Sequence, residues 1–223
     1  MNINLLKYPT KSHRKTIKTP RESIRLAELI GIEFGDGGIN NPWQVVITLN
    51  ADKDEKYAEY VVRLIRELFG IEPVVRKRGK RTLQIVSSSI SLVDFLVKKG
   101  AVRGNKIKQM FDIPNWVGKN DKYSKVFVRG LVDTDGCLYI HRHKIKGVNY
   151  KNIGFCFTSY SRNLLNSVAS ILRKSGIESY IKNDGRSIYL YGKNAVENYI
   201  NIFGSSNPRI FDLYKKWRDA RAV

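Results

Sequence analysis

The sequence predicts an α+β protein built from two copies of one αββαββα unit, each copy forming an antiparallel sheet with helices on one face. The first observation is an internal repeat, because residues 63–85 and 170–190 match in order and residue type. Matched residues such as Ile71 and Ile177 are 106 positions apart. The second observation is that each copy passes from helical to two-residue periodicity. The remaining face of each sheet is polar and therefore expected to be exposed.

The repeat divides the chain into three parts. Residues 1–19 form a basic arm, residues 20–118 the first repeat and residues 119–223 the second. The boundary lies in the segment IPNWVGKNDKY, where a proline and a glycine interrupt the pattern before a new helix begins.

The first helix has a start and an end that can be read from the sequence. Thr19, Pro20 and Glu22 have the spacing of a capping box with proline at the first helical position, so we expect the helix to begin there. The helix ends at the glycines that follow Phe34, because glycine lets the chain turn away from the helix axis.

A stripe of small residues runs along this helix and along its copy. Ala27 and Gly31 are four residues apart, and Gly130 occupies the position that matches Gly31 in the second copy. Glycine inside a helix costs about 1 kcal/mol relative to alanine, so a compensating contact is indicated. We expect the two helices to pack closely through these faces, which brings Asp36 and Asp135 side by side at one end of the pair.

The sheets are predicted by alternation of apolar and polar residues. Residues 44–49 alternate in the first copy and residues 152–158 in the second. Apolar residues at helical spacing follow in 57–68 and in 165–172, and two further strands and a helix complete each copy.

One hairpin allows its register to be predicted. If Lys146 and Gly147 form a two-residue turn, Cys137 and Cys156 lie directly opposite each other on neighbouring strands. A disulfide between them is one hypothesis, and two reduced cysteines used for packing are the alternative. Two cysteines exclude a four-cysteine zinc site.

The chain is strongly basic. Its 40 Lys and Arg residues outnumber 20 Asp and Glu residues, which gives a formal charge of +20 and a pI near 10.0. A polyanion is the expected partner, and a generally cationic surface without a defined ligand is the alternative. Hydrophobic residues make up 42% of the chain, which excludes a disordered basic tail. Because no apolar run approaches about 18 residues and no signal peptide is recognisable, we expect a cytoplasmic protein without a membrane partner.

The two aspartates indicate a metal site. Carboxylates that are held close together repel each other unless cations lie between them. Oxygen ligands without histidine or cysteine favour Mg²⁺ or Mn²⁺, which polarise phosphoryl oxygens and activate water.

Two short motifs carry a resemblance to a known family. LIGIEFGDG at 29–37 and VRGLVDTDG at 128–136 resemble the signature nonapeptides of the LAGLIDADG homing endonucleases. The chain resembles, over residues 20–215, the single-chain, two-repeat kind encoded in archaeal introns. The resemblance implies a monomer with a saddle of two pseudo-symmetric halves, with both sheets in the major groove of double-stranded DNA. It also implies metal-dependent hydrolysis of both strands that leaves 3′ overhangs, with Ca²⁺ supporting binding without cleavage.

The resemblance also assigns site residues. Asp36 and Asp135 would bind the metal ions, with the preceding carbonyls of Gly35 and Thr134 as further ligands. At the sixth motif position stand Glu33 and Asp133, for which capping of the helix end or solvation is the alternative.

A basic residue in each half would lie beside the attacking water. The matches are Lys106, with a solvated surface lysine as the alternative, and Arg209, which stands where a lysine would be more familiar and raises unequal cutting of the two strands. Asn50 and Ser159, at the ends of the second strands, would position solvent.

The polar sheet faces are the expected DNA-reading surfaces, because arginine suits guanine and asparagine or glutamine suits adenine. The expected residues are, in the first sheet, Gln44, Thr48, Arg76 and Arg78, and in the second, Tyr139, His141, His143, Tyr150, Asn152 and Lys182. A metal-binding pair is the alternative for the two histidines. The basic N-terminal arm and the end YKKWRDAR add backbone contacts or are merely solvated.

Two other functions share this sequence pattern. A maturase that binds its host intron RNA, or a DNA-binding regulator, would keep the fold without cutting. An RNA-binding protein of ribosomal type would explain the charge, but it leaves the paired glycine-lined helices and their aspartates without a cause.

Overall fold

The computed structural model describes residues 15–220. Its element order confirms the predicted α+β fold, with the αββαββα unit present twice. The first unit comprises α1 (Ile24–Phe34), β1 (Gly37–Asn41), β2 (Gln44–Asn50), α2 (Glu55–Phe69), β3 (Val74–Arg78), β4 (Thr82–Ser88) and α3 (Ile90–Lys98). The second comprises α5 (Asp121–Asp135), β5 (Gly136–Ile145), β6 (Val148–Thr158), α6 (Arg162–Lys174), β7 (Tyr180–Ile181), β8 (Ser187–Tyr191) and α7 (Lys193–Ile202). Within the described residues, three elements lie outside the two units: η3 (Lys106–Lys108), α4 (Asn115–Gly118) and α8 (Pro208–Asp219).

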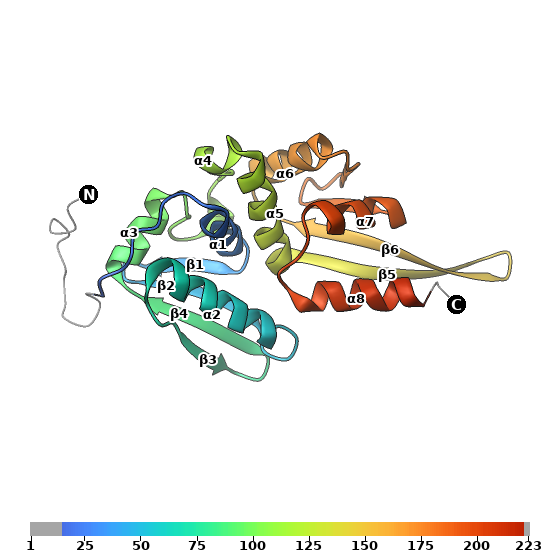
Figure 1. Ribbon diagram of the computed structural model, residues 1–223. Helices are drawn as coiled ribbons and strands as arrows, with labels where there is room; N and C mark the ends of the chain where they lie inside the picture. The colour runs from blue at the N-terminus through green and yellow to red at the C-terminus, as the bar shows by residue number, and fades with distance from the viewer. Residues whose placement is uncertain (1–14, 221–223) are drawn as a thin grey trace.

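Each unit forms one four-stranded antiparallel sheet. The strand orders are β1-β2-β4-β3 and β5-β6-β8-β7, so the two sheets have the same topology. The units form two lobes that meet at α1 and α5, and the β5–β6 hairpin projects far from this junction (Figure 1). The two sheets therefore flank the paired helices.

The helix pair at the junction packs at backbone distance. α1 and α5 make the most extensive helix–helix contact of the described chain. A Cβ atom on Gly31 would collide with the carbonyl oxygen of Phe127, and one on Gly130 would collide with the carbonyl oxygen of Glu28. Ala27 is fully buried on the same side of α1. Each helix thus places a residue without a side chain against the backbone of the other, as the stripe of small residues predicts.

The start of α1 differs from the prediction. The helix begins at Ile24, and the hydroxyl of Ser23 accepts the N–H of Leu26 at 3.3 Å, so Ser23 and not Thr19 caps it. Glu22 is used in tertiary contacts instead. Its carboxylate accepts from Lys99 at 2.6 Å, and its carbonyl accepts from the hydroxyl of Tyr123 at 3.1 Å. These contacts, between residues far apart in the chain, override the local capping signal.

The β5–β6 hairpin has the predicted turn and register. Lys146 and Gly147 have φ angles of 47° and 85°, as a two-residue turn of the type common in hairpins requires. Cys137 lies opposite Cys156 in the ladder, and both are free thiols, so the disulfide is not formed.

The last helix, α8, is packed against the second repeat. α8 carries Trp217, which is buried and donates its indole N–H to the carbonyl of Lys151 at 3.1 Å. This part of the C-terminal segment therefore packs on the second sheet. The N-terminal arm lies largely outside the described residues. Within residues 15–220 no helix has the length and apolar character needed to cross a bilayer.

We predict that Gly31→Ala lowers the free energy of unfolding by about 2–3 kcal/mol, because the new methyl group overpacks a backbone contact. At an open helical position the same change stabilises by up to about 1 kcal/mol. Gly118→Ala is the matched control, since nothing lies within 4 Å of a Cβ atom there. Chemical denaturation measures both variants, and equal effects would contradict the close packing of α1 and α5.

Candidate functional site

Asp36 and Asp135 lie at the ends of the paired helices. Asp36 follows Gly35, which ends α1, and Asp135 is the last residue of α5. Burial, together with the negative charges of Asp135 and Asp54, raises the pKa of Asp36 to about 7. Burial also raises the pKa of Asp135 to about 6, although its side chain still reaches water. The negative charge of Asp135 thus acts on Asp36 at a place where both residues remain partly accessible to solvent.

Lys106 is anchored at the end of α1. Its ammonium donates to the carbonyls of Glu33, Phe34 and Gly35 at 2.8, 3.0 and 2.8 Å. Burial lowers the pKa of Lys106, whereas Glu33 and the two aspartates act in the opposite direction. Lys106 is therefore not a solvated surface lysine. It complements the negative end of the α1 dipole and places a positive charge beside both aspartates.

Arg209 reaches the same region from the second repeat but has a different anchor. Its Nε lies 3.2 Å from a carboxylate oxygen of Asp54, which is buried between the repeats. The charge of Arg209 lowers the pKa of Asp36. The side-chain amide of Asn207 caps α5 by donating to the carbonyl of Asp133 at 3.0 Å. Lys106 and Arg209 are thus not equivalent in geometry, although they match in sequence.

The acids at the sixth motif position are both buried, which excludes solvation. Burial raises the pKa of Glu33 to about 7, opposed first by the charge of Lys106. Burial also raises the pKa of Asp133 to about 7, although its carboxylate accepts the hydroxyl of Ser205 and, at 2.6 Å, the N–H of Ser206. Both residues belong to the packing around the helix pair.

A buried ion pair that the sequence reasoning missed crosses the same junction. Arg129 of α5 donates to both carboxylate oxygens of Glu28 of α1, at 3.1 and 2.6 Å. The hydroxyl of Ser206 also donates to Glu28, at 2.5 Å. The available signal was a charged residue close to each helix glycine: Glu28 lies three positions before Gly31, and Arg129 directly precedes Gly130.

The outer face of the first sheet continues from Asp36. A pocket of about 370 Å³ joins Asp36 to the four expected DNA-reading residues of this sheet, Gln44, Thr48, Arg76 and Arg78. The N–H of Thr48 donates to the carbonyl of Asp36 at 2.9 Å. Thr48, Gln84 and Arg76 form one row across three strands, and Arg76 donates to Gln84 at 3.3 Å. Hydrogen-bonding groups therefore line the outer face of the first sheet as far as Asp36.

The outer face of the second sheet is aromatic. The ring of His143 stacks with those of His141 and Tyr150, at centroid distances of 5.1 and 5.4 Å. Tyr139 covers Gly154, where a Cβ atom would collide with the tyrosine ring. Asn152 lies opposite His141. Among the described residues no group of three potential ligands includes the two histidines, so a metal pair there gains no support.

Two tyrosines of this face were not expected from the sequence. Tyr189 and Tyr191 stack at 5.5 Å, and their ladder partners are Cys156 and Gly154. The alternation in SIYLY was the signal that could have found them. Lys182 lies beyond the edge strand, 3.6 Å from the carboxylate of Asp184.

The two residues expected to position solvent are engaged in turns. The side-chain oxygen of Asn50 accepts the N–H groups of Asp52 and Lys53 at 2.9 and 3.1 Å. The hydroxyl of Ser159 accepts the N–H of Ser161 at 3.2 Å. The hydroxyl of Thr134 donates to carbonyls of its own helix.

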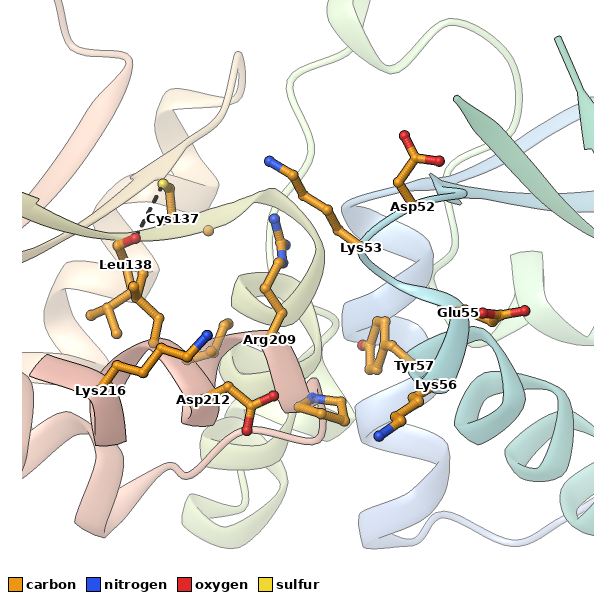
Figure 2. Close-up of a pocket in the computed structure, with 14 residues that line it drawn as sticks. Asp52, Lys53, Glu55, Lys56, Tyr57, Cys137, Leu138, Arg209, Asp212 and Lys216 are labelled. Atoms are coloured by element: carbon orange, nitrogen blue, oxygen red, sulfur yellow. Dashed lines mark hydrogen bonds between the residues drawn. The ribbon is translucent and has the colours of Figure 1, made fainter. Parts of the chain in front are cut away.

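A second pocket, of about 590 Å³, lies between the repeats beside this site. Its lining includes the segment before α2, the start of β5 and the first turns of α8. Figure 2 shows Lys53 and Arg209 extending into it from opposite sides, while Asp52 points away. Basic side chains from both repeats therefore border the same opening.

Comparison with known proteins agrees with this fold. The sequence model of one protein family, the LAGLIDADG-like domain, matches residues 122–214. Variants of the homing endonuclease I-DmoI share 15% identity over 82% of this chain and 97% of theirs, with a TM-score of 0.54. I-SmaMI, bound to an uncleaved DNA target in the presence of calcium ions, shares 12% identity over 87% of this chain and 89% of its own, with a TM-score of 0.60.

The fold also occurs in a protein that is not named as an endonuclease. Full-length DUF199/WhiA from Thermatoga maritima shares 15% identity over 92% of this chain and 63% of its own, with a TM-score of 0.53. No curated protein is detectably similar in sequence. At these identities the likeness shows the fold.

We predict that Asp36→Asn stabilises the metal-free protein at about pH 8 and that the gain shrinks as the pH is lowered towards 4. Folding raises the pKa of Asp36 from 3.8 to about 7, so the stability that its protonated form contributes is lost as the pH rises across this window. Because the side chain is partly hydrated, the gain at high pH is about 1–2 kcal/mol. Urea unfolding at both pH values measures it, and a gain that does not depend on pH would contradict the raised pKa of Asp36.

Proposed function

We propose that this protein, which has the fold of the LAGLIDADG homing endonucleases, is a sequence-specific DNA endonuclease that hydrolyses both strands of a long duplex site. The observation that carries the proposal is the meeting of Asp36 and Asp135 at the junction of two sheets with polar outer faces. Two neighbouring carboxylates repel each other and destabilise the folded protein, and a regulator that only binds DNA would have no use for them. A hydrolase that holds divalent cations needs them.

The residues at the junction fit such cations. Burial and, after it, the negative charge of Asp135 raise the pKa of Asp36, and a bound cation would return the carboxylate to its ionised form. The donors are oxygens, which suits Mg²⁺ and Mn²⁺. The carbonyl of Gly35 accepts a hydrogen bond from Lys106 at 2.8 Å, so a metal ion bound to this oxygen would share it with the ammonium group. When bound, the metal would polarise the scissile phosphate and activate water.

The protein's own side chains would then bind and orient the DNA. The charge of +20 attracts the duplex, and the two sheet faces would lie in its major groove on either side of the cut. Lys106 and Arg209 place positive charge where the phosphate and its attacking water would lie. Their different anchors support unequal cutting of the two strands. The complex of I-SmaMI with DNA and calcium ions supports the use of Ca²⁺ for binding without cleavage.

A non-cleaving nucleic-acid-binding protein is the second candidate. The likeness to DUF199/WhiA favours it, because the same fold occurs there in a protein not named as a nuclease. A maturase acting on its host intron RNA belongs to this class. Retention of both aspartates favours cleavage.

We predict that Asp36→Asn and Asp135→Asn each abolish cleavage in Mg²⁺ and preserve or improve DNA binding in Ca²⁺. Each change removes a ligand charge and relieves repulsion at the junction. The assay incubates protein with long duplexes that include its own uninterrupted insertion locus and maps the cut ends. Asp94→Asn, an exposed change on α3, is the charge-matched control. Normal cutting by both site variants would refute the mechanism, and binding without cutting by the unaltered protein would favour the second candidate.

We predict that Arg78→Ala weakens binding by about 1–3 kcal/mol and relaxes base preference at one position of the site. Arg78 lines the pocket that leads to Asp36, which places it among the groups facing base edges. Selection from a randomised duplex library in Ca²⁺ measures the preference. Arg63→Ala removes the same charge from the exposed side of α2. Uniform weakening across sequences would reassign Arg78 to a phosphate contact.

A further inference from the structure

Asp54 is a third carboxylate near the paired aspartates. It is only 5% exposed, and its charge is among the causes that raise the pKa of Asp36. Its partners come from both repeats. One oxygen accepts the N–H of Asn50 at 3.3 Å, and the other accepts the side-chain amide of Asn207 at 3.0 Å and lies 3.2 Å from Nε of Arg209.

The usual reasons for an acid at this position do not apply. Asp54 precedes α2, yet its side chain makes no capping bond to that helix. Among the described residues it belongs to no group of three potential metal ligands. Its carboxylate is instead directed across the junction at the start of α8.

Arg209 depends on this acid for its position. Its backbone N–H donates to Asn207 at 3.1 Å, which fixes the first turn of α8, but within residues 15–220 no other carboxylate forms an ion pair with its guanidinium. The Nε contact with Asp54 is an ion pair without the alignment of a linear hydrogen bond, so charge holds it. A buried carboxylate acts strongly on such a partner because little water screens it.

The two basic residues are therefore held by different chemistry. Three carbonyl dipoles at the end of α1 hold Lys106, whose charge acts on both Asp36 and Asp135. A full negative charge holds Arg209, whose charge acts on Asp36. Removing the charge of Asp54 would leave Lys106 in place and release Arg209.

We propose that Asp54 is a positioning residue that clamps Arg209 across the two repeats and so sets the rate at which one of the two DNA strands is cut. This inference rests on the proposed endonuclease function. It assigns a role in the reaction to a residue that lies outside both signature motifs and acts through Arg209.

The test compares Asp54→Asn, which keeps the shape of the side chain, with Asp52→Asn, an exposed change two residues away. Cutting of each strand is followed separately with end-labelled duplex in Mg²⁺. Asp54→Asn is expected to slow one strand at least about tenfold, because loss of the clamp misplaces a group beside the scissile phosphate. The other strand, DNA binding in Ca²⁺ and the Asp52→Asn control remain unchanged.

A double-mutant cycle separates the clamp from a general loss of stability. In an Arg209→Gln background, Asp54→Asn is expected to have no further effect on the slowed strand. Independently of cutting, the Nε–H signal of Arg209 in nuclear magnetic resonance spectra of the free protein, identified by its loss in Arg209→Gln, should shift in Asp54→Asn and stay in place in Asp52→Asn.

The outcomes distinguish the two proposals. If the unaltered protein cuts but Asp54→Asn slows both strands alike, slows neither, or multiplies the effect of Arg209→Gln, the clamp is wrong and the endonuclease stands. An unshifted Nε–H signal also refutes the clamp. If the unaltered protein cuts no duplex, the endonuclease fails and with it the role of Asp54 in strand cutting.

Discussion

The close approach of α1 and α5 is the constraint on which the rest of the structure depends. Gly31 and Gly130 each meet the backbone of the opposite helix, so the axes cannot separate without opening a cavity and cannot approach without collision. The ends of both helices are thereby fixed relative to each other. Asp36 and Asp135 repel one another at those ends, and the packing of two lobes holds them there. This repulsion lowers the stability of the folded protein at the place where cations would be bound.

A buried polar layer adds register to this apolar contact. Desolvating Glu28 and Arg129 costs free energy that their mutual attraction only partly returns, so their pairing across the junction is a weak source of stability. The pair does fix the register of α1 against α5, because sliding one helix along the other by a turn would leave both charges unpaired. Ser206 and Asn207 extend the layer from the second repeat to acids of the first. The loop before α8 thus ties the two halves together at the height of the glycines.

The sequence predicted the fold well because its signals are local and occur twice. Alternation defined the strands, the Lys146–Gly147 turn fixed the register of one hairpin, and the small residues identified the helix junction. The prediction was wrong where a distant contact decided the outcome. Glu22, which was expected to take part in a capping box, contacts Lys99 and Tyr123 instead. Asp54 could not be predicted at all, because its partners Asn207 and Arg209 are more than 150 positions away in the chain.

Duplication explains the symmetry of the molecule, and the differences between the copies explain why its halves need not act alike. The first sheet presents one row of threonine, glutamine and arginine, in which Arg76 is hydrogen-bonded to Gln84, whereas the second presents stacked histidines and tyrosines. Groups of the first kind match the edges of base pairs, and aromatic planes make broader and less selective contacts. The basic residue of one half is held by helix carbonyls and that of the other by a carboxylate. If both differences act during recognition and cutting, one half of a bound site is read more strictly and the two strands are cut at different rates.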